Sequence, residues 1–468
     1  MSEQLIRDLS EALAPDELMQ GSQIDQRYKT DWSKAVVREP LAVVRPRSTA
    51  AVSAALKACH AHGHPVTVQG GMTGLVGASQ TNDGDVVISL ERLNGVEEID
   101  RAASCMTVWA GTPLQIAQEQ AQAADLYLAV DLGARGSCQV GGNIATNAGG
   151  NRVIRYGMMR EQILGLEVVL ADGTVISNLN KMLKNNAGYD IKQLFIGSEG
   201  TLGIVTRAVL RLHPTPPDTT TVLCALASEE AMLGLLARVR QAADASLLAF
   251  EVMWPDFFEF MTTRVPDNVS PFESGSSATR PMTVLMDLAT GASGLSAQGV
   301  QDMLQASFEA GELADAVIAQ SGKQAAQFWR IRDSVSEFPL VFAPYTSFDV
   351  SLPIQTVSEF VCTLKQQIAQ TWAGSESLYF GHIGDSNLHI VVHVPGTRES
   401  FPKDAVDSLV YELVRHYQGS VSAEHGIGVR KKIWLGHTRQ PAEIELMKTI
   451  KRALDPKAIL NPGRVVDL

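Results

Sequence analysis

The amino-acid sequence predicts an α+β protein of at least two domains, and three observations lead to this prediction. Stretches rich in Val, Ile and Leu alternate with longer stretches in which apolar residues recur every three to four positions, as is typical of strands and helices. Prolines and threonines are concentrated in residues 213–221, where we expect a domain boundary. The length of 468 residues suffices for two or three domains.

The first half of the chain begins with an amphipathic pattern in residues 1–21 and then continues as strand, helix and strand. Within residues 48–63 the apolar positions have helical spacing, Ser48 or Thr49 can cap the first turn, and Gly63 can end the helix. The expected strands of this half lie at residues 41–46, 65–71, 85–93, 165–176 and 203–214. An Asp-Gly pair inside the fourth of these stretches predicts a hairpin.

The second half, from about residue 222 to 425, alternates strands with Ala-rich helices. The expected strands lie at residues 221–228, 281–289, 377–383 and 387–395, and the expected helices at 229–243 and 404–418. A last helix at residues 441–456 precedes the C-terminal tail. This alternation predicts an α+β plait.

Composition excludes several classes of function. The net charge is −12, and the longest basic cluster is residues 430–432, which argues against nucleic acid or an anionic membrane surface as a partner. Five scattered cysteines without a Cys-x-x-Cys pair suit a reducing cytoplasm and argue against Fe–S or four-cysteine zinc sites. We expect a cytoplasmic protein, because no signal peptide pattern and no apolar stretch of membrane-spanning length is present.

Three glycine-rich stretches point to a cofactor. Residues 68–79 follow a strand and contain four glycines, whose backbone N–H groups can face one concavity and hold a pyrophosphate, although such a stretch can also be a plain turn. It is not a Rossmann loop, because no G-x-G-x-x-G opens a helix. Residues 136–157 combine glycines with short polar side chains that can hydrogen-bond phosphate, ribityl hydroxyls or a flavin ring. Residues 196–206 add a third small-residue turn.

These three loops, in this order, resemble the FAD-binding domain of the vanillyl-alcohol oxidase / p-cresol methylhydroxylase superfamily. The sequence GSCQVGGNIATNAGG in the second loop is similar to that of the FAD-binding D-2-hydroxy acid dehydrogenases, the branch with D-2-hydroxyglutarate and D-lactate dehydrogenases. The resemblance implies a two-part FAD-binding domain of the vanillyl-alcohol oxidase type at residues 1–215. It further implies an α+β substrate (cap) domain with a metal site at 216–425, and a C-terminal helical return at 426–468.

The resemblance also implies which residues contact FAD. The first loop would cradle the pyrophosphate, while the second loop, the third loop and the C-terminal NPGR sequence would line the rest. The residues so implied are Gly70, Gly71, Thr73, Gly74, Gly77, Ala78, Gly133, Ser137, Gly141, Gly142, Asn143, Thr146, Asn147, Ala148, Gly149, Gly150, Tyr156, Ile204, Val205 and Asn461. Members with covalent flavin carry a histidine in the first loop, where this chain has Met72 and Thr73, so we expect non-covalent FAD.

Two histidines, His382 and His389, flank the turn sequence GHIGDSNLH. Such a turn can be an ordinary surface turn, but two strands around it would bring the two imidazoles together, and imidazole is the commonest metal ligand. Downstream, SAEHGIG adds a carboxylate and another histidine. A set of two His and one Glu with an open position fits a catalytic divalent metal, zinc first. In the family's pattern His382, His389 and Glu424 match the metal ligands, and His425 matches the catalytic histidine.

The chemistry expected from this set is oxidation of an alcohol. A bound metal lowers the pKa of a coordinated oxygen, an imidazole with an ordinary pKa of roughly 6.5 can then accept the hydroxyl proton, and the hydride passes to the flavin. Arg332 matches the family's substrate arginine and Ser336 a neighbouring hydroxyl. Without the resemblance, either Arg330 or Arg332 can equally lie on a solvated helix face.

The resemblance also shows departures. Ser347 stands where a D-2-hydroxyglutarate dehydrogenase has a substrate-binding lysine, and Val391 stands where it has an asparagine. We expect Val391 to offer apolar surface, and neutral or apolar D-2-hydroxy acids such as D-lactate to compete with D-2-hydroxyglutarate. His393 is interpreted as structural, and the three histidines between residues 60 and 64 as surface residues at a helix end.

The predicted reaction is therefore oxidation of a D-2-hydroxy acid to the 2-oxo acid. Electrons would leave to a carrier such as an electron-transfer flavoprotein or a cytochrome, and not to nicotinamide. Two alternatives are a flavin-dependent transferase similar to ether-lipid synthase and a flavin subunit of a glycolate/lactate oxidase-type electron-transfer complex. The oligomeric state stays open, a homodimer included.

Overall fold

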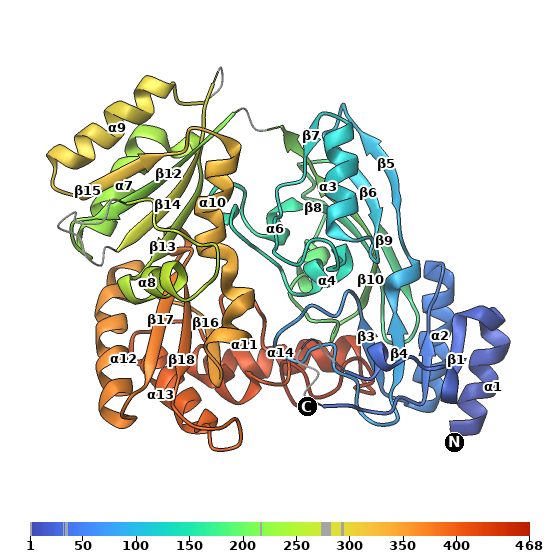
Figure 1. Ribbon diagram of the computed structural model, residues 1–468. Coiled ribbons are helices and arrows are strands. Elements are labelled where there is room, and N and C mark those ends of the chain that lie inside the picture. Colours follow the sequence, from blue (N-terminus) through green and yellow to red (C-terminus); the bar gives the residue numbers. More distant parts are fainter. Residues whose placement is uncertain (1, 31, 33–35, 216–217, 273–281, 292–293) are drawn as a thin grey trace. The chain divides into compact units, whose positions relative to one another are not determined.

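The computed structural model describes residues 2–30, 32, 36–215, 218–272, 282–291 and 294–468. The described chain divides into two compact units (Figure 1). Unit 1 comprises Met1–Gly150, Gly157–Thr215 and Glu424–Leu468, and unit 2 comprises Asn151–Tyr156 and Pro216–Ala423. The proline-rich boundary expected at residues 213–221 falls partly on residues 216–217, which lie outside the described residues. No helix among the described residues has both the length and the apolar character needed to cross a membrane.

Unit 1 contains a four-stranded sheet in the order β1-β2-β4-β3, in which β2 and β3 run parallel to β4 and β1 runs antiparallel to β2. Its strands are β1 (Leu18–Gln20), β2 (Ala42–Val44), β3 (Val66–Gln69) and β4 (Val86–Ser89). The helices α1 (Ser2–Ala12) and α2 (Thr49–His62) pack against each other. The expected helix is confirmed in α2, because the Ser48 side chain accepts the Ala51 N–H and Gly63 ends the helix in the left-handed conformation.

The second sheet of unit 1 is antiparallel, in the order β5-β6-β10-β8-β9. Its strands are β5 (Val96–Asp100), β6 (Cys105–Trp109), β8 (Ile163–Val169), β9 (Val175–Asn178) and β10 (Ile204–Arg211), and β7 (Leu126–Tyr127) pairs separately with β11 (His213–Pro214). The hairpin expected around the Asp-Gly pair is confirmed between β8 and β9, where Gly173 has a φ of +83°.

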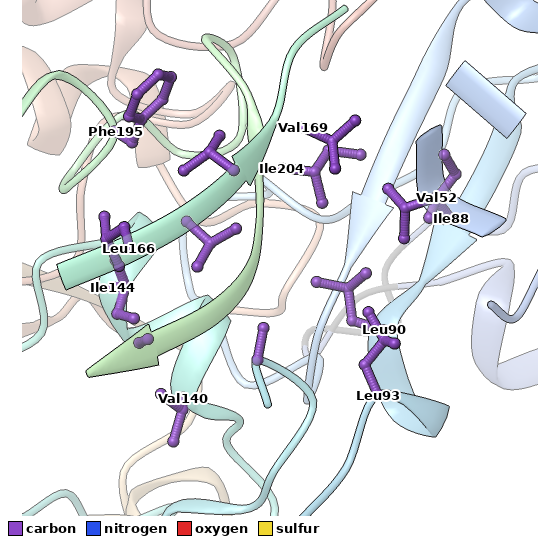
Figure 2. Close-up of a cluster of buried hydrophobic side chains, with 14 of the residues drawn as sticks. Val52, Ile88, Leu90, Leu93, Val140, Ile144, Leu166, Val169, Phe195 and Ile204 are labelled. Atoms are coloured by element: carbon purple, nitrogen blue, oxygen red, sulfur yellow. The ribbon is translucent and has the colours of Figure 1, made fainter. Parts of the chain in front are cut away.

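Unit 1 contains further helices, and one apolar core joins its two sheets. The helices are α3 (Leu114–Ala123), α4 (Val140–Ala145), α6 (Met159–Gln162) and α14 (Pro441–Leu454). The core combines residues of α2 and β4 with residues of α4, β8 and β10, as Figure 2 shows for Val52, Ile88, Ile144, Leu166 and Ile204. Burial of this continuous apolar surface holds the glycine loops that leave β3, α4 and the approach to β10.

Unit 2 is built on a seven-stranded sheet whose neighbouring strands are all antiparallel, in the order β15-β12-β14-β13-β17-β18-β16. The strands are β12 (Thr219–Leu226), β13 (Leu247–Met253), β14 (Thr283–Ala289), β15 (Leu313–Ile318), β16 (Tyr345–Ser351), β17 (Glu376–Gly381) and β18 (Asn387–His393). The helices are α5 (Val153–Tyr156), α7 (Ala231–Ala243), α8 (Pro255–Thr263), α9 (Ala297–Glu309), α10 (Gly322–Asp333), α11 (Phe338–Val341), α12 (Val357–Thr371) and α13 (Lys403–His416). The alternation expected for this half of the chain is thus confirmed.

The two faces of this sheet differ. One face carries an aromatic core in which α8, α10 and α11 contribute residues that pack on Leu285, Met253 and Phe380 of the strands. The opposite face meets α13, whose Tyr411 ring contacts Phe348 of β16. Side chains alternate between the two faces along a strand. Successive residues of each strand therefore point toward the aromatic core and toward the α13 side in turn.

Candidate active site

Unit 1 contains a cavity of about 300 Å³ whose wall is formed by all three predicted glycine loops. The predicted cofactor residues in the wall are Gly70, Gly71, Thr73, Gly74, Ala78, Gly133, Gly141, Gly142, Asn143, Thr146, Ala148, Gly149, Ile204, Val205 and Asn461. Phe195, Glu199, Glu424 and His425 also line it. Within the second loop, residues 140–145 form the helix α4, which the sequence analysis did not predict.

The glycines of this cavity have two different reasons to lack a side chain. A Cβ on Gly71 would lie 2.0 Å from the Ser137 carbonyl oxygen, and one on Gly141 would lie 2.7 Å from the Ala110 Cβ, so the loops could not pack. A Cβ on Gly74 or Gly142 would meet no protein atom within 4 Å. Because Gly74 and Gly142 line the wall, the open space beside them belongs to the cavity.

Five predicted cofactor residues do not line the cavity. Gly77 and Gly150 have positive φ angles of +77° and +105° and shape the loops, while Ser137 donates to the Ala134 carbonyl. Asn147 accepts the backbone N–H of Arg160 at 2.9 Å. Tyr156 lies in α5, which belongs to unit 2.

The segment from Glu424 to Gly428 is held firmly in unit 1. Glu424 Oε1 accepts the Gly150 N–H at 3.0 Å, so the carboxylate is fixed against the second glycine loop. The buried carboxylate of Glu199 accepts the N–H groups of Ile427 and Gly428 at 2.7 and 2.8 Å. Burial raises the pKa of Glu199, and the two N–H donors oppose this rise. His425 is therefore carried by a loop tied at both ends.

Asn461 lines the cavity, but both polar atoms of its side chain form hydrogen bonds within the protein. Its Oδ1 accepts the Val68 N–H at 2.8 Å and its Nδ2 donates to the Glu199 carbonyl at 2.7 Å, which joins the first and third loops. The Oε1 of Gln139, which also lines the cavity, is buried and has no hydrogen-bond partner among the described residues. The concavity of glycines, the orphaned amide oxygen and the apolar Phe195 fit a flavin dinucleotide.

Unit 2 brings Arg332 and His382 together around a residue that the sequence interpretation missed, Glu251. His382 Nδ1 lies 2.5 Å from Glu251 Oε1, and Arg332 Nε donates to Glu251 Oε2 at 2.8 Å. Arg332 Nη2 lies 3.3 Å from His382 Nε2. Burial alone would favour a neutral Glu251, but His382 and Arg332, which lie against its two oxygens, lower the pKa of this carboxyl to about 2.

The hairpin between β17 and β18 places the two predicted histidine ligands side by side, as expected. The ring centroids of His382 and His389 are 5.4 Å apart at an angle of 79°, and the turn is closed by Ser386 with a φ of +72°. His389 Nδ1 lies 3.9 Å from Oδ1 of the fully buried Asp349. Phe380 contacts both His389 and Arg332. Its ring centroid is 5.0 Å from that of His389 and 5.0 Å from the guanidinium carbon of Arg332.

Asn387 is the clearest sign that unit 2 binds a ligand beside His389. It lies two residues before His389 on the same face of β18, and its side chain is buried. Neither its Oδ1 nor its Nδ2 has a hydrogen-bond partner among the described residues. A buried amide without partners costs free energy, so its presence fits a site that is completed by a bound group. Two imidazoles beside such an amide fit a divalent metal.

The remaining substrate residues have separate positions. Ser347 is exposed and lies directly opposite Val391 in the pairing of β16 with β18. Ser336 is exposed in a short 3₁₀ segment one turn beyond Arg332. The expectation that Val391 offers apolar surface is wrong, because it is 2% exposed and packs in the aromatic core of unit 2.

Arg330, His393 and the histidines at the end of α2 lie outside this group. Arg330 donates to the Pro266 carbonyl and to Asp267 and is exposed, unlike the buried Arg332. His393 Nδ1 lies 2.8 Å from the Pro344 carbonyl oxygen, which agrees with a structural role. The three histidines at the end of α2, which we expect at the surface from the sequence, are partly buried, and His62 pairs with Asp8.

The sequence analysis missed Glu251, Asp349, Asn387 and Glu199. A signal did exist for Glu251, because it is the one charged residue in the otherwise apolar strand LLAFEVM. Asp349 offers a similar signal in YTSFDVS. Burial of a charge in a strand predicts a partner, but the sequence does not say which residue the partner is.

Comparisons with known proteins show which family the chain belongs to. Residues 40–178 match the FAD binding domain family model, and residues 215–465 match the model of the C-terminal domain of FAD linked oxidases. A protein named D-2-hydroxyglutarate dehydrogenase from Xanthomonas citri pv. viticola is 38% identical, over 94% of this chain and 92% of its own length. A protein of the same name from Stutzerimonas stutzeri is 34% identical over 98% of both chains.

Solved structures of other proteins share the fold. Alkyldihydroxyacetonephosphate synthase has a TM-score of 0.75 at 16% identity, covering 98% of this chain and 85% of its own. p-Cresol methylhydroxylase with substrate bound also has a TM-score of 0.75, at 17% identity, covering 99% of this chain and 97% of its own. The α+β architecture with a two-part FAD-binding domain of the vanillyl-alcohol oxidase type is thereby shown. With both domain models matched and relatives aligned over nearly its whole length, the chain belongs to the FAD-linked oxidases, in the family of FAD-binding D-2-hydroxy acid dehydrogenases.

Proposed function

We propose that this protein oxidises a D-2-hydroxy acid to the 2-oxo acid with FAD and a divalent metal, and passes the electrons to a carrier other than nicotinamide. The observation that carries the proposal is the cavity of unit 1, where three glycine loops and His425 share one wall. Flavin would be held there by the cofactor residues named above, with unit 1 as the FAD-binding domain and unit 2 as the substrate domain. When bound, FAD supplies a hydride acceptor, and a divalent metal supplies a Lewis acid that lowers the pKa of an alcohol.

The protein's own residues have distinct tasks in this proposal. His425 accepts the hydroxyl proton of the substrate as general base. Arg332 binds the α-carboxylate with the N–H groups that Glu251 leaves available, and the hydroxyls of Ser336 and Ser347 donate to the substrate. His382, His389 and Glu424 hold the metal, with Zn²⁺ as the first candidate.

The chain connection at Glu424 supports its place in the ligand set. In unit 2 the preceding residue, Ala423, donates its N–H to Asp349 Oδ2 at 3.2 Å, and Asp349 pairs with His389 across β16 and β18. Glu424 is the next residue of the chain, and in unit 1 its carboxylate is fixed against Gly150.

The flavin is proposed to be non-covalent. Met72, with a φ of +58°, and Thr73 occupy the wall of the first loop, and neither side chain can form the histidyl link of covalent members. Denaturation in acid should therefore release all the yellow colour into the supernatant. Colour that stays with the precipitated chain would contradict this part of the proposal.

The side chain of the substrate is the least constrained part of the proposal. The similar proteins are named D-2-hydroxyglutarate dehydrogenase, whereas Ser347 brings no cation to the face that carries Asp349 and His389. Because Val391 is buried, the case for neutral acids now depends on Ser347 alone. We propose that D-lactate and longer neutral homologues compete with D-2-hydroxyglutarate.

An anaerobic titration tests the function. Purified protein is mixed with D- and L-forms of lactate, 2-hydroxyisocaproate, malate and 2-hydroxyglutarate, and loss of the visible flavin absorbance is followed. We expect bleaching by D-forms only, and kcat/KM values for the neutral and dicarboxylic D-acids that lie within about a hundredfold, since losing one charge-assisted hydrogen bond is worth roughly 1.5–3 kcal/mol. Ser347→Lys should shift the ratio toward the diacids. No bleaching by any member of the panel would refute the function.

Metal removal tests the role of the metal, and His425→Ala tests the role of the general base. A strong chelator should abolish turnover while FAD stays bound, because the proposed ligands are not the residues that form the glycine loops, and Zn²⁺, Mn²⁺ or Co²⁺ should restore it. His425→Ala should keep metal and flavin and lose roughly 10²–10⁴-fold in kcat, the usual contribution of a general base. Full activity in protein that elemental analysis shows to be free of metal would end the metal's role.

The setting of the enzyme is proposed on separate grounds. None of the five cysteines forms a disulfide and four are buried, which supports a reducing compartment such as the cytoplasm. An electron-transfer flavoprotein or a cytochrome is the proposed acceptor. The transferase alternative has only the shared fold in its favour, since the alkyldihydroxyacetonephosphate synthase similarity is 16% in sequence.

A further inference from the structure

Glu251 is a carboxylate in a strand where burial disfavours a charged side chain. It is 1% exposed in the centre of β13, and every residue of that strand is buried. Burying an ionised carboxylate is costly unless cations and hydrogen bonds compensate it. Glu251 has both, since each of its two oxygens faces a different cationic or polar group, Arg332 on one side and His382 on the other.

The contacts of Glu251 determine the tautomer of His382. An ionised carboxylate only accepts hydrogen bonds, so the proton at the 2.5 Å contact belongs to His382 Nδ1. On the other side of the ring, Arg332 Nη2 can only donate, so Nε2 accepts at 3.3 Å and carries a lone pair. Two independent contacts thus leave Nε2 as the nitrogen that can bind a metal, and carboxylate partners of this kind orient metal-binding histidines.

The same carboxylate restrains Arg332. Nε is held by Glu251 at 2.8 Å, the guanidinium carbon lies 5.0 Å from the centroid of the Phe380 ring, and Nη2 points at His382 Nε2. A metal on Nε2 would compete with the N–H of Arg332 for that lone pair. Metal binding would therefore free one Arg332 donor for the carboxylate of a substrate.

We propose that Glu251 is a positioning residue that couples the metal to the substrate carboxylate, by fixing His382 with one oxygen and Arg332 with the other. This inference rests on the proposed function, because it takes His382 as a metal ligand and Arg332 as the substrate arginine. It predicts that one substitution at Glu251 weakens both binding events, although Glu251 touches neither ligand.

The test uses the full-length FAD-loaded protein, stripped of metal and titrated with Zn²⁺ against a chelating indicator. Glu251→Gln keeps the shape of the side chain, but its amide has one acceptor oxygen for two donors. We expect Zn²⁺ affinity to fall about 10–100-fold, the range found when such a partner of a metal ligand is removed. KM for the hydroxy acid should rise more than kcat falls, and the visible spectrum of the Co²⁺-loaded protein should change.

Asp287→Asn is the matched control. Asp287 is a buried carboxylate on β14, on the same sheet face, and it accepts from Arg152 and Trp329. Its substitution should lower Tm but leave Zn²⁺ affinity and the Co²⁺ spectrum unchanged. If Glu251→Gln does not fold, Glu251→Asp replaces it, because the shorter side chain cannot reach both partners and should show the same loss in smaller degree.

The outcomes separate the two levels of inference. Wild-type protein that binds no Zn²⁺, or His382→Ala that binds it as tightly as wild type, contradicts the proposed function. If wild type binds tightly and His382→Ala does not, while a folded Glu251 variant keeps wild-type Zn²⁺ affinity and KM, the coupling through Glu251 is overturned and the function stands.

Discussion

Gly71 and Gly74 stand three residues apart in the first loop and should respond oppositely to the same substitution. In Gly71→Ala the new Cβ would lie 2.0 Å from the Ser137 carbonyl oxygen, so the loops must separate, and overpacking of this kind typically costs about 1–3 kcal/mol. In Gly74→Ala the Cβ meets no protein atom within 4 Å. We expect Gly71→Ala to lower the urea midpoint of the flavin-free protein and Gly74→Ala to leave it unchanged while weakening FAD binding. Equal urea midpoints for the two variants would contradict this account.

At the scale of single residues, the sequence predicted those with distinctive chemistry. It did not predict residues whose role depends on whether they are buried. His382 and His389 were found because they flank one turn and match the family's pattern of metal ligands, and their rings do lie together. Val391 was misjudged because alternation shows which residues share a face but not whether that face meets solvent or a core. Glu251 was missed because its partners come from positions far along the chain, at Arg332 and His382.

Whole elements were predicted best where local signals agree. For α2, apolar spacing, a serine cap and a terminal glycine all indicated one helix, and its bounds are those expected. The short helix α4 was missed, because it contains adjacent glycines, which disfavour a helix by about 1 kcal/mol each. Packing decides this segment, since the Gly141 Cα lies so close to Ala110 that only glycine fits.

The helix α13 supplies a prediction about pH. Burial, and the charge of Asp404, raise the pKa of Asp407 against the attraction of Lys403, and its Oδ1 is buried without a partner among the described residues. Between its ordinary pKa of 3.8 and the raised value, the folded state binds more protons than the unfolded state, so stability falls as pH rises through this window. Asp407→Asn should therefore raise Tm at neutral pH, and the gain should vanish in acid.

The control for this measurement is Asp302→Asn on α9, an exposed carboxylate whose replacement should change Tm little at any pH. A gain for Asp407→Asn that is constant from acid to neutral pH would show that titration of this carboxyl is not its cause.

For the molecule as a whole, the C-terminal segment should decide whether flavin is retained. Leu460 pairs with Val66 of β3, Asn461 bonds Val68 and Glu199, and Lys451 donates to the Thr201 carbonyl. Removing residues 459–468 should therefore lower Tm and give a flavin-to-protein ratio near zero after gel filtration. Removing only residues 467–468, which are exposed, should leave both unchanged. A normal ratio in the longer deletion would refute this dependence.

The division of unit 1 into three stretches of chain, the last beginning at Glu424, has a consequence for biosynthesis. A ribosome makes the chain from its N-terminus, so β3 and the first glycine loop emerge almost four hundred residues before Leu460 and Asn461 arrive to pair with them. Unit 2 is synthesised in the interval and can fold first as a local unit. The flavin cavity is thus completed only after residues 459–468 have left the ribosome, and until then the nascent chain carries β3 without the partners that Leu460 and Asn461 supply.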